Sequence, residues 1–270
     1  MRFTKGHGTG NDFILVDESV ELSQDLVAAL CDRRFGIGGD GVLRVARQGD
    51  LFFMDYWNSD GSLAEMCGNG VRVFARYLWE EGLITGSSVA VATRAGVRTA
   101  YLEWDGIRVD MGAPKLLGTS DGGLAISMGN PHLVYEVSNV DKIDLSTAPA
   151  FDEAFFPEGV NVSYYEWVGD DHDHVRMRVY ERGSGETLSC GTGASAVGVA
   201  ALNAKGQQVG AVIVDVPGGR LRVTVDEQTS WLSGPAVLVA NGHLDVASLS
   251  GRPANPAEHP WPATRPRAQR

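Results

Sequence analysis

The sequence lacks any apolar run close to the roughly 20 residues that a membrane-spanning helix requires. Its N-terminus also lacks a basic segment followed by an apolar core, the pattern of a secretory signal. A cytoplasmic protein with no membrane partner is therefore expected. Basic residues are scarce and scattered, with 23 Lys and Arg against 34 Asp and Glu and a net charge of −11. No nucleic-acid partner is expected, because phosphate binding requires a basic face.

Cysteine is also scarce. Cys31, Cys67 and Cys190 are too few and too far apart for a disulfide framework. No C-x-x-C pair is present, and the His-containing "DDHDHV" at 170–175 is interpreted as a solvated turn, so no metal site is predicted. Cys31 follows an apolar, helix-like run and is expected to be a buried structural thiol. Any chemistry at the other two must come from single thiols or from a pair joined by folding.

The chain repeats itself around these two cysteines. "MCGNGVRVFARYL" at 66–78 has a counterpart in "SCGTGASAVGVAAL" at 189–202. Each segment reads Cys-Gly-x-Gly, continues as a helix-competent run, and is followed by a glycine that can close a helix, Gly82 or Gly206. The second helix contains no charged residue, so it is expected to be buried on all sides.

The segments before each cysteine also correspond. Strand-like "DLFFMDYW" and "VRMRVYE" precede the first and second cysteine, and "GNDFILVD" from Gly10 matches "GNPHLVYEV" from Gly129. The separation from asparagine to cysteine is similar in the two copies, from Asn11 to Cys67 and from Asn130 to Cys190. Features that recur in one order at similar spacing indicate two homologous halves.

The predicted fold is α+β, with two halves related by a pseudo-two-fold axis. Short strands bounded by turns favour a mostly antiparallel sheet in each half, wrapped around one central helix. The first half, 1–117, carries Cys67 and the second, 118–250, carries Cys190; a return of the last strand to the first half is left open. Residues 251–270 contain five prolines and no apolar periodicity, and a disordered tail is expected there.

The chemistry follows from the position of the thiols. A cysteine at a helix start meets unpaired N–H groups and the positive end of the helix dipole, which stabilise a thiolate and favour a lowered pKa. One such cysteine could equally be a packing residue. Two of them facing one cleft suit removal of a proton from one face of a carbon and delivery to the other, without a cofactor if amide groups stabilise the carbanion.

Five motifs together resemble the diaminopimelate epimerase family: "HGTGNDF", "NSDGSLAEMCGNGVR", "GNPH", "GVNVSYYE" and "YERGSGETLSCGTGASA". The resemblance runs from about residue 1 to 245. It implies a pyridoxal-independent isomerase of lysine and cell-wall precursor synthesis that interconverts LL- and meso-diaminopimelate, forms a homodimer and needs no cofactor. In the related proline racemases a histidine usually stands where this chain has Asn69.

The resemblance also implies the roles of particular residues. Cys67 and Cys190 are the acid and base, and His132 and Glu181 tune them. Substrate contacts are implied for Asn11, Asn58, Gly68, Asn69, Asn130, Asn161, Glu181, Arg182, Gly191 and Thr192. These roles are chemically reasonable, because a carboxylate can accept from an ammonium group and a guanidinium can fork onto a carboxylate.

One departure from the family pattern is Gly41, where many members have Gln, and a weakened substrate contact is expected there. Three other interpretations of the chain stay open. It could be a racemase or epimerase of another amino acid such as proline, a thiol redox switch that uses Cys67 and Cys190, or a non-catalytic amino-acid-binding module.

Overall fold

The computed structural model describes residues 1–249, so the tail expected at 251–270 lies outside the described residues. Its helices are α1 (Gln24–Cys31), α2 (Gly68–Glu80) and α3 (Gly191–Ala204), with short 3₁₀ turns η1 (Val140–Lys142) and η2 (Val246–Ser248). No helix within residues 1–249 is long and apolar enough to cross a bilayer.

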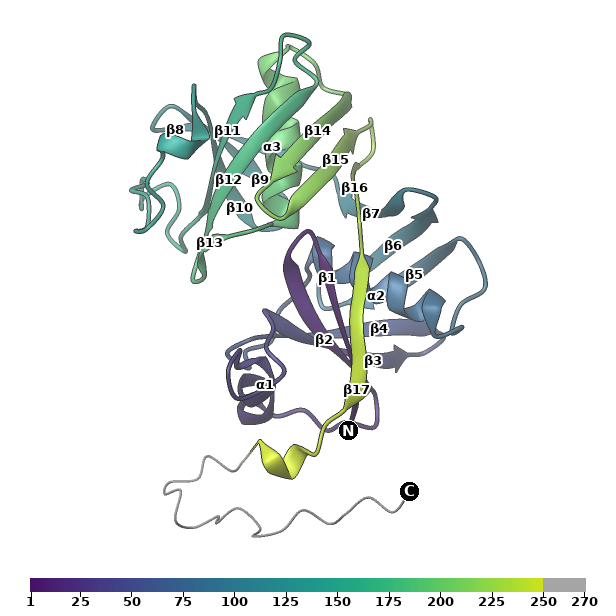
Figure 1. Ribbon diagram of the computed structural model, residues 1–270. Coiled ribbons are helices and arrows are strands. Elements are labelled where there is room, and N and C mark those ends of the chain that lie inside the picture. The colour runs from purple at the N-terminus through teal and green to yellow at the C-terminus, as the bar shows by residue number, and fades with distance from the viewer. Residues whose placement is uncertain (250–270) are drawn as a thin grey trace, which may run out of the picture.

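The strands form two groups that lie one above the other in Figure 1. The first group comprises β1 (Arg2–Gly8), β2 (Asn11–Asp17), β3 (Gly41–Gln48), β4 (Leu51–Asn58), β5 (Ser88–Thr93), β6 (Gly96–Glu103), β7 (Gly106–Gly112) and the last strand, β17 (Val237–His243). The second comprises β8 (Lys115–Ser120), β9 (Gly123–Ser127), β10 (Pro131–Glu136), β11 (Asn161–Trp167), β12 (His174–Glu181), β13 (Gly185–Thr187), β14 (Gly210–Val216), β15 (Gly219–Val225) and β16 (Ser230–Gly234).

The pairing of the strands repeats between the two groups. Most neighbours are antiparallel, but β2–β3 and β4–β5 are parallel in the first group, as are β10–β11 and β12–β14 in the second. The four strand segments that the sequence repeat predicted correspond to β2, β4, β10 and β12. The predicted α+β fold of two related halves is therefore confirmed.

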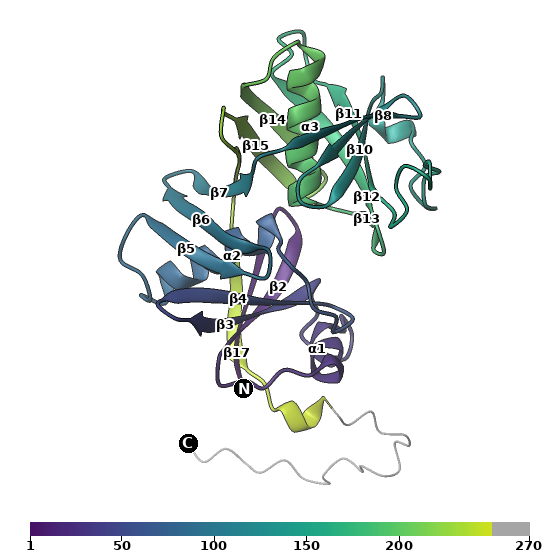
Figure 2. The same cartoon turned by 180° about the vertical axis from the view of Figure 1, so that it is seen from behind.

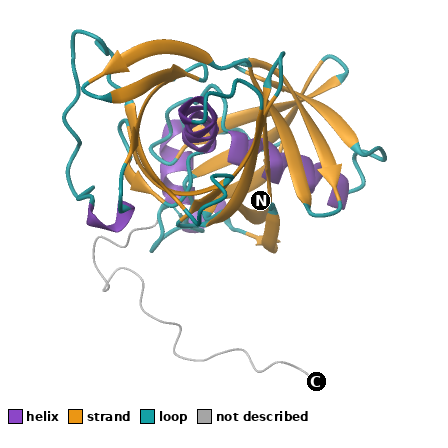
Figure 3. Ribbon diagram, turned by 90° about the horizontal axis from the view of Figure 1, so that it is seen from above, coloured by secondary structure: helices purple, strands orange, loops and turns teal. Residues whose placement is uncertain are grey.

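Each half wraps its sheet around one helix. Viewed from above, the strands of the second half surround α3 (Figure 3). Nearly every residue of α3 from Gly191 to Leu202 is buried, as its lack of charge predicted. The helix α2 occupies the equivalent place in the first half and buries ten of its residues.

Two strands connect the halves. Strand β16 pairs with β15 of the second half and also with β7 of the first, so the hydrogen-bonded sheet continues from one half to the other. The chain then enters β17, which pairs antiparallel with β1 and runs down the first half (Figure 2). The sheet that begins the chain is thus completed by its last strand.

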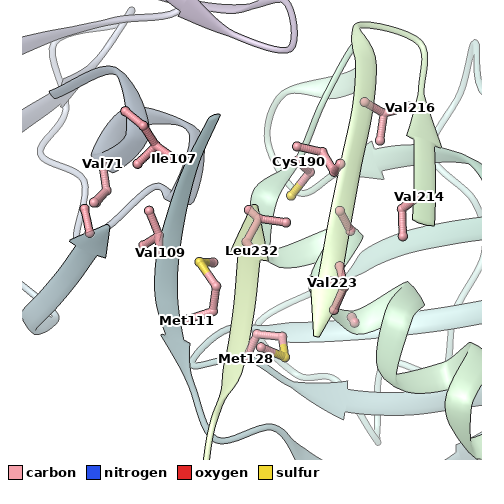
Figure 4. Close-up of a cluster of buried hydrophobic side chains, with 14 of the residues drawn as sticks. Val71, Ile107, Val109, Met111, Met128, Cys190, Val214, Val216, Val223 and Leu232 are labelled. Carbon is pink, nitrogen blue, oxygen red and sulfur yellow. The ribbon is translucent and has the colours of Figure 1, made fainter. Parts of the chain in front are cut away.

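A hydrophobic core extends through both halves, and Leu232 of β16 lies at their junction, near Met111 and Cys190 (Figure 4). A Cβ atom added at Gly68 or at Gly191 would lie 3.2 Å from the Leu232 Cδ2 atom. The same added atom at Gly191 would lie 3.3 Å from the Gly68 Cα atom. These glycines therefore allow the first turns of α2 and α3 to contact each other and the same leucine.

Cys31 is the last residue of α1. It belongs to a smaller core cluster that also contains Val27, Leu30 and Val42. Its side chain is buried, as predicted for a structural thiol.

Candidate active site

Cys67 and Cys190 have equivalent local structures. Each is the N-cap of its helix, in extended backbone conformation, because a short side chain with an acceptor atom can replace the missing helical hydrogen bond there. The Cys67 Sγ atom accepts from the Gly70 N–H at 3.4 Å, and the Cys190 Sγ atom accepts from the Gly193 N–H at 3.3 Å. The helix starts expected from the sequence are therefore present in both halves.

The expected lowering of the thiol pKa values is wrong. Burial raises the pKa of Cys67 to about 11, and the hydrogen bond from Gly70 offsets only part of that effect. Burial also raises the pKa of Cys190 well above its ordinary value, and the nearby Glu181 carboxylate adds to the rise. Removal of a thiolate from water outweighs the helix-terminal N–H groups and, at Cys67, the positive charge of Arg72.

The side chain of Asn11 lies beside Cys67. Its Oδ1 atom accepts from the Cys67 thiol at 3.5 Å and from the Asn69 Nδ2 group at 3.2 Å. Asn69 is fully buried and also donates to the Ser189 carbonyl at 3.0 Å, so its side chain bridges the two halves. The Nδ2 group of Asn69 is thus already committed to protein contacts, whereas its Oδ1 atom is buried with no hydrogen-bond partner within residues 1–249.

A chain of hydrogen bonds within the second half connects Cys190 to His132. The Thr192 Oγ1 atom lies 3.5 Å from the Cys190 Sγ atom and accepts from the Asn130 Nδ2 group at 3.3 Å. The Asn130 Oδ1 atom in turn lies 3.1 Å from the His132 Nε2 atom. His132 is fully buried, and burial lowers its pKa to about 3, so the ring is neutral at physiological pH. Its route to the thiol runs through Asn130 and Thr192.

Glu181 is the last residue of β12 and Arg182 follows it, and both line the same cavity as Cys67 and Cys190. Burial raises the pKa of Glu181, while hydrogen bonds from Thr187 and Cys190 act in the opposite direction. The Asn161 amide accepts from the Arg182 backbone N–H at 3.0 Å, and the Arg182 guanidinium donates to the Glu158 carbonyl at 2.6 Å. The guanidinium has no carboxylate partner among residues 1–249, so it can receive an anionic group.

One cavity of about 1430 Å³ connects these groups. Of the sequence-predicted residues, all but His132 line it: Asn11, Asn58, Cys67, Gly68, Asn69, Asn130, Asn161, Glu181, Arg182, Cys190, Gly191 and Thr192. They come from both halves and from segments far apart in the sequence. No cluster of three His, Cys, Asp or Glu side chains suited to a metal ion occurs in the described part of the chain.

The sequence analysis did not predict a group of charged residues that also lines the cavity: Lys5, Asp12, Arg33 and Asp40. Asp12 forms ion pairs with Lys5 at 2.6 Å and with Arg33 at 2.7 Å, and Arg33 also contacts Asp40 at 2.7 Å. Burial acts to raise the pKa of Asp12, but hydrogen bonds and charges from Arg33 and Lys5 together lower it. Asp40 accepts from the Asn11 Nδ2 group at 2.8 Å, which directs the Asn11 carbonyl toward Cys67. The segment "GGDG" at 38–41 contains Asp40, but no pattern in it predicts a contact with Asn11.

Arg72 was also missed. This fully buried residue of α2 donates to neutral acceptors: the Thr9 hydroxyl at 3.3 Å, the Pro235 carbonyl at 3.3 Å and the Gly68 carbonyl at 3.5 Å. Burial lowers its pKa to about 10, which leaves the guanidinium charged at neutral pH.

The arrangement can exchange protons at a bound carbon. Two thiols at two helix starts line one cavity, and each is accompanied by backbone N–H groups that can hold a carboxylate. A family model described as diaminopimelate epimerase matches residues 3–117 and 124–242.

The chain belongs to the diaminopimelate epimerase family.

Curated members of the diaminopimelate epimerase family are similar over almost their whole length. The diaminopimelate epimerase of Thermobifida fusca is 47% identical, with 92% of this chain and 100% of that protein covered. That of Rhodococcus opacus is 46% identical, with 93% and 99% covered. That of Corynebacterium glutamicum is 45% identical, with 90% and 98% covered.

Solved structures share the fold at lower identity. A phenazine biosynthesis protein of the PhzF family from Bacillus anthracis has a TM-score of 0.70 at 18% identity, covering 90% of this chain and 98% of that one. A hydroxyproline epimerase from Agrobacterium vitis has a TM-score of 0.66 at 15% identity, covering 90% and 91%. These likenesses support the two-half architecture alone.

The backbone at Gly41, where a weakened substrate contact was expected, leaves no room for a side chain. A Cβ atom at Gly41 would lie 2.4 Å from the Trp57 carbonyl oxygen and 2.8 Å from the Tyr56 ring. Tyr56 itself lines the cavity. In this chain the space beside residue 41 is therefore filled from β4.

Proposed function

We propose that the protein is a two-base epimerase that interconverts LL-2,6-diaminopimelate and meso-2,6-diaminopimelate without pyridoxal phosphate or a metal ion. The observation that carries the proposal is the pair of helix-capping thiols, Cys67 and Cys190, on one cavity. Family membership and the curated relatives supply the substrate class.

In the proposed reaction, a thiolate at one cysteine takes the α-proton, so the Cα–H bond breaks and an S–H bond forms. The electron pair stays on the α-carbon and is delocalised into the adjacent carboxylate, which the N–H groups around Gly68 and Gly191 stabilise. The thiol of the second cysteine then gives its proton to the opposite face. The two cysteines have exchanged protonation states, and the carbon is inverted.

The raised thiol pKa values give substrate binding a further role. Both thiols are protonated at neutral pH, so one proton must leave before catalysis. The substrate brings two ammonium groups, and a nearby positive charge favours a thiolate. We propose that Glu181, which accepts a hydrogen bond from Cys190, can accept one from a substrate ammonium group instead, and that Arg182 binds the distal carboxylate.

The proposal is tested by incubating LL-diaminopimelate with the protein in deuterated water without added cofactor. Deuterium should enter the α-position together with inversion. Cys67→Ala and Cys190→Ala should each reduce both by about 10²–10⁴-fold. Cys31→Ala is the matched control, because Cys31 is buried in a separate cluster, and it should retain activity. Activity on proline without activity on diaminopimelate would overturn the substrate assignment.

We further propose that the protein is a cytoplasmic homodimer. Within each chain, we propose that the first half ends at residue 117 and the second begins at residue 118. Two strands cross this boundary in the fold. Strand β8 begins at Lys115 and pairs with β9 of the second half, and β17 adds residues 237–243 to the first half. Light scattering coupled to size-exclusion chromatography should give twice the chain mass of 28.9 kDa. A monomer mass at all concentrations contradicts the dimer, and cell fractionation tests the location.

A further inference from the structure

The two-residue turn between β1 and β2 holds an unusual residue. Both Thr9, with φ of 52°, and Gly10, with φ of 83°, adopt the left-handed backbone conformation. Such turns normally carry Asn-Gly or Gly-Gly, because a side chain disfavours positive φ. For a β-branched residue the conformation is especially unfavourable, and it persists only where the surroundings require it. Thr9 is therefore a candidate for a specific role.

The side chain of Thr9 is buried and fully engaged, with 1% of the residue exposed. Its Oγ1 atom lies 2.6 Å from the Ser189 Oγ atom and accepts from the Arg72 guanidinium at 3.3 Å. Ser189 immediately precedes Cys190, whereas Arg72 belongs to the helix that Cys67 caps. A glycine or an asparagine would relieve the backbone, but glycine has no hydroxyl and asparagine is larger.

A second contact closes this bridge. The Asn69 Nδ2 group donates to the Ser189 carbonyl at 3.0 Å and to the Ser189 Oγ atom at 3.2 Å. Asn69 lies two residues after Cys67. Thr9, Ser189 and Asn69 thus form a buried polar junction between the residue before one thiol and the first turn of the helix that carries the other.

The backbone of the turn is held against the second half as well. A Cβ atom at Gly218, between β14 and β15, would lie 1.7 Å from the Thr9 carbonyl oxygen, so only glycine permits this approach. A Cβ atom at Gly10 would lie 3.1 Å from the Leu188 side chain. In Figure 1 the tip of the β1–β2 hairpin points toward the upper half.

We propose that Thr9 is a positioning residue, whose hydroxyl bridge to Ser189 sets the spacing and direction of the Cys67 and Cys190 thiols across the cavity. This inference rests on the proposed epimerase function and deepens it. Thr9 itself does not line the cavity, and its hydroxyl bonds to Ser189 and Arg72. Two-base proton transfer is sensitive to such spacing, because misplacement of reacting groups by a fraction of an ångström to an ångström reduces turnover strongly.

The kinetic test compares three substitutions at one site. Thr9→Val removes the hydroxyl and keeps the branched shape, Thr9→Gly removes the hydroxyl and relieves the backbone, and Thr9→Ser keeps the hydroxyl. Val and Gly should reduce kcat by about tenfold or more, with KM changed less than about threefold, and Ser should restore kcat to within about threefold of wild type. The thermal unfolding midpoint should fall less in Thr9→Gly than in Thr9→Val, because both lose the hydroxyl contacts but only glycine relaxes the strained φ.

The matched control is Thr4→Val, which removes another buried hydroxyl, at a position of β1 that does not line the cavity. It should leave kcat unchanged. Ser189→Ala should reproduce the loss, and the double variant Thr9→Val/Ser189→Ala should be no worse than either alone by more than about twofold, as expected for partners in one interaction. If Thr9→Gly lowers the midpoint while kcat per folded molecule stays at the wild-type value, Thr9 is only structural and the proposal is overturned.

A measurement independent of turnover separates this inference from the proposed function. A short bis-methanethiosulfonate should cross-link Cys67 to Cys190, and methyl methanethiosulfonate reports the reactivity of each thiol alone. In Thr9→Val the ratio of cross-linking to single labelling should fall by about fivefold relative to wild type. An unchanged ratio overturns the role of Thr9 even if the protein is an epimerase. A reduced ratio in a protein with no epimerase activity overturns the function and retains the positioning. If Thr9→Val does not fold, the comparison of Thr9→Gly with Thr9→Ser decides both readouts.

Discussion

The neutral, buried ring of His132 should make the protein sensitive to mild acid. Its pKa is lowered from 6.5 to about 3 by burial, and the residue is 0% exposed. In the unfolded chain the same ring takes up a proton as the pH falls through 6.5, whereas the folded protein resists protonation down to about pH 3. Below pH 6.5 the unfolded state therefore binds more protons, and the stability contributed by the neutral ring is progressively lost.

The size of this loss of stability follows from the shift in the pKa of His132. Each pH unit below 6.5 costs about 1.4 kcal/mol, so the free energy of unfolding should fall by about 2 kcal/mol between pH 7.5 and pH 5 from this residue alone. The comparison is with His132→Gln, whose amide can replace the Nε2 contact with Asn130 without titrating. Urea unfolding of both proteins at pH 7.5, 6 and 5 isolates the contribution, because all other groups are common to the pair.

The wild-type protein should lose about 2 kcal/mol more than His132→Gln over this range, whatever the constant offset between them at pH 7.5. His243→Gln, on the exposed face of β17, is the matched control and should follow the wild-type curve. A difference between wild type and His132→Gln that stays flat from pH 7.5 to pH 5 would refute the argument, because it would mean that the ring is protonated in the folded protein or is not desolvated.

Three further predictions concern the thiol, the Gly41 site and the junction of the halves. Because burial raises the Cys67 pKa to about 11, iodoacetamide labelling of this thiol in the empty protein should rise about tenfold per pH unit from pH 7 to 10, measured by peptide mass spectrometry; a plateau near pH 8 would contradict the shift. Gly41→Gln should destabilise by about 1–3 kcal/mol in urea, because its Cβ atom meets the Trp57 backbone, whereas Gly86→Gln, with no neighbour closer than 3.8 Å, should have little effect. Leu232→Ala should cost about 2–5 kcal/mol and reduce turnover, whereas the 55%-exposed Leu116→Ala should do neither; equal effects would show that Leu232 does not join the halves.

Much of the fold could be predicted from the sequence, because a duplicated pattern is local. The Cys-Gly-x-Gly starts of α2 and α3 contain the capping residue and the glycines that define them, and alternating side chains indicate the strands that precede them. The lack of charge in α3 was sufficient to predict its burial. Features that depend on distant partners were less accessible: no pattern in 237–243 requires β17 to pair with β1 rather than with a strand of the second half.

In the candidate site, too, local features could be predicted from the sequence, and features that depend on distant residues could not. The residues of the family motifs line the cavity, but the direction of the thiol pKa shifts was mispredicted, because it depends on how much protein surrounds each sulfur atom. The helix-terminal N–H groups could be identified from the sequence and the desolvation could not. Likewise, "HGTGNDF" contains Thr9 without any sign that its backbone is left-handed or that Ser189, 180 positions away, is its partner.

The pairing of β17 with β1 has a consequence for folding during synthesis. During synthesis β1 leaves the ribosome first, but one of its two neighbouring strands follows only after the whole second half has been made. At about 5–20 residues per second, that edge of β1 waits for roughly 10–50 seconds. The second half has its strands in one uninterrupted stretch and can close before the first. The first half is therefore the later to be completed, and the cavity, whose lining includes Val239 of β17, is complete only once this strand is in place.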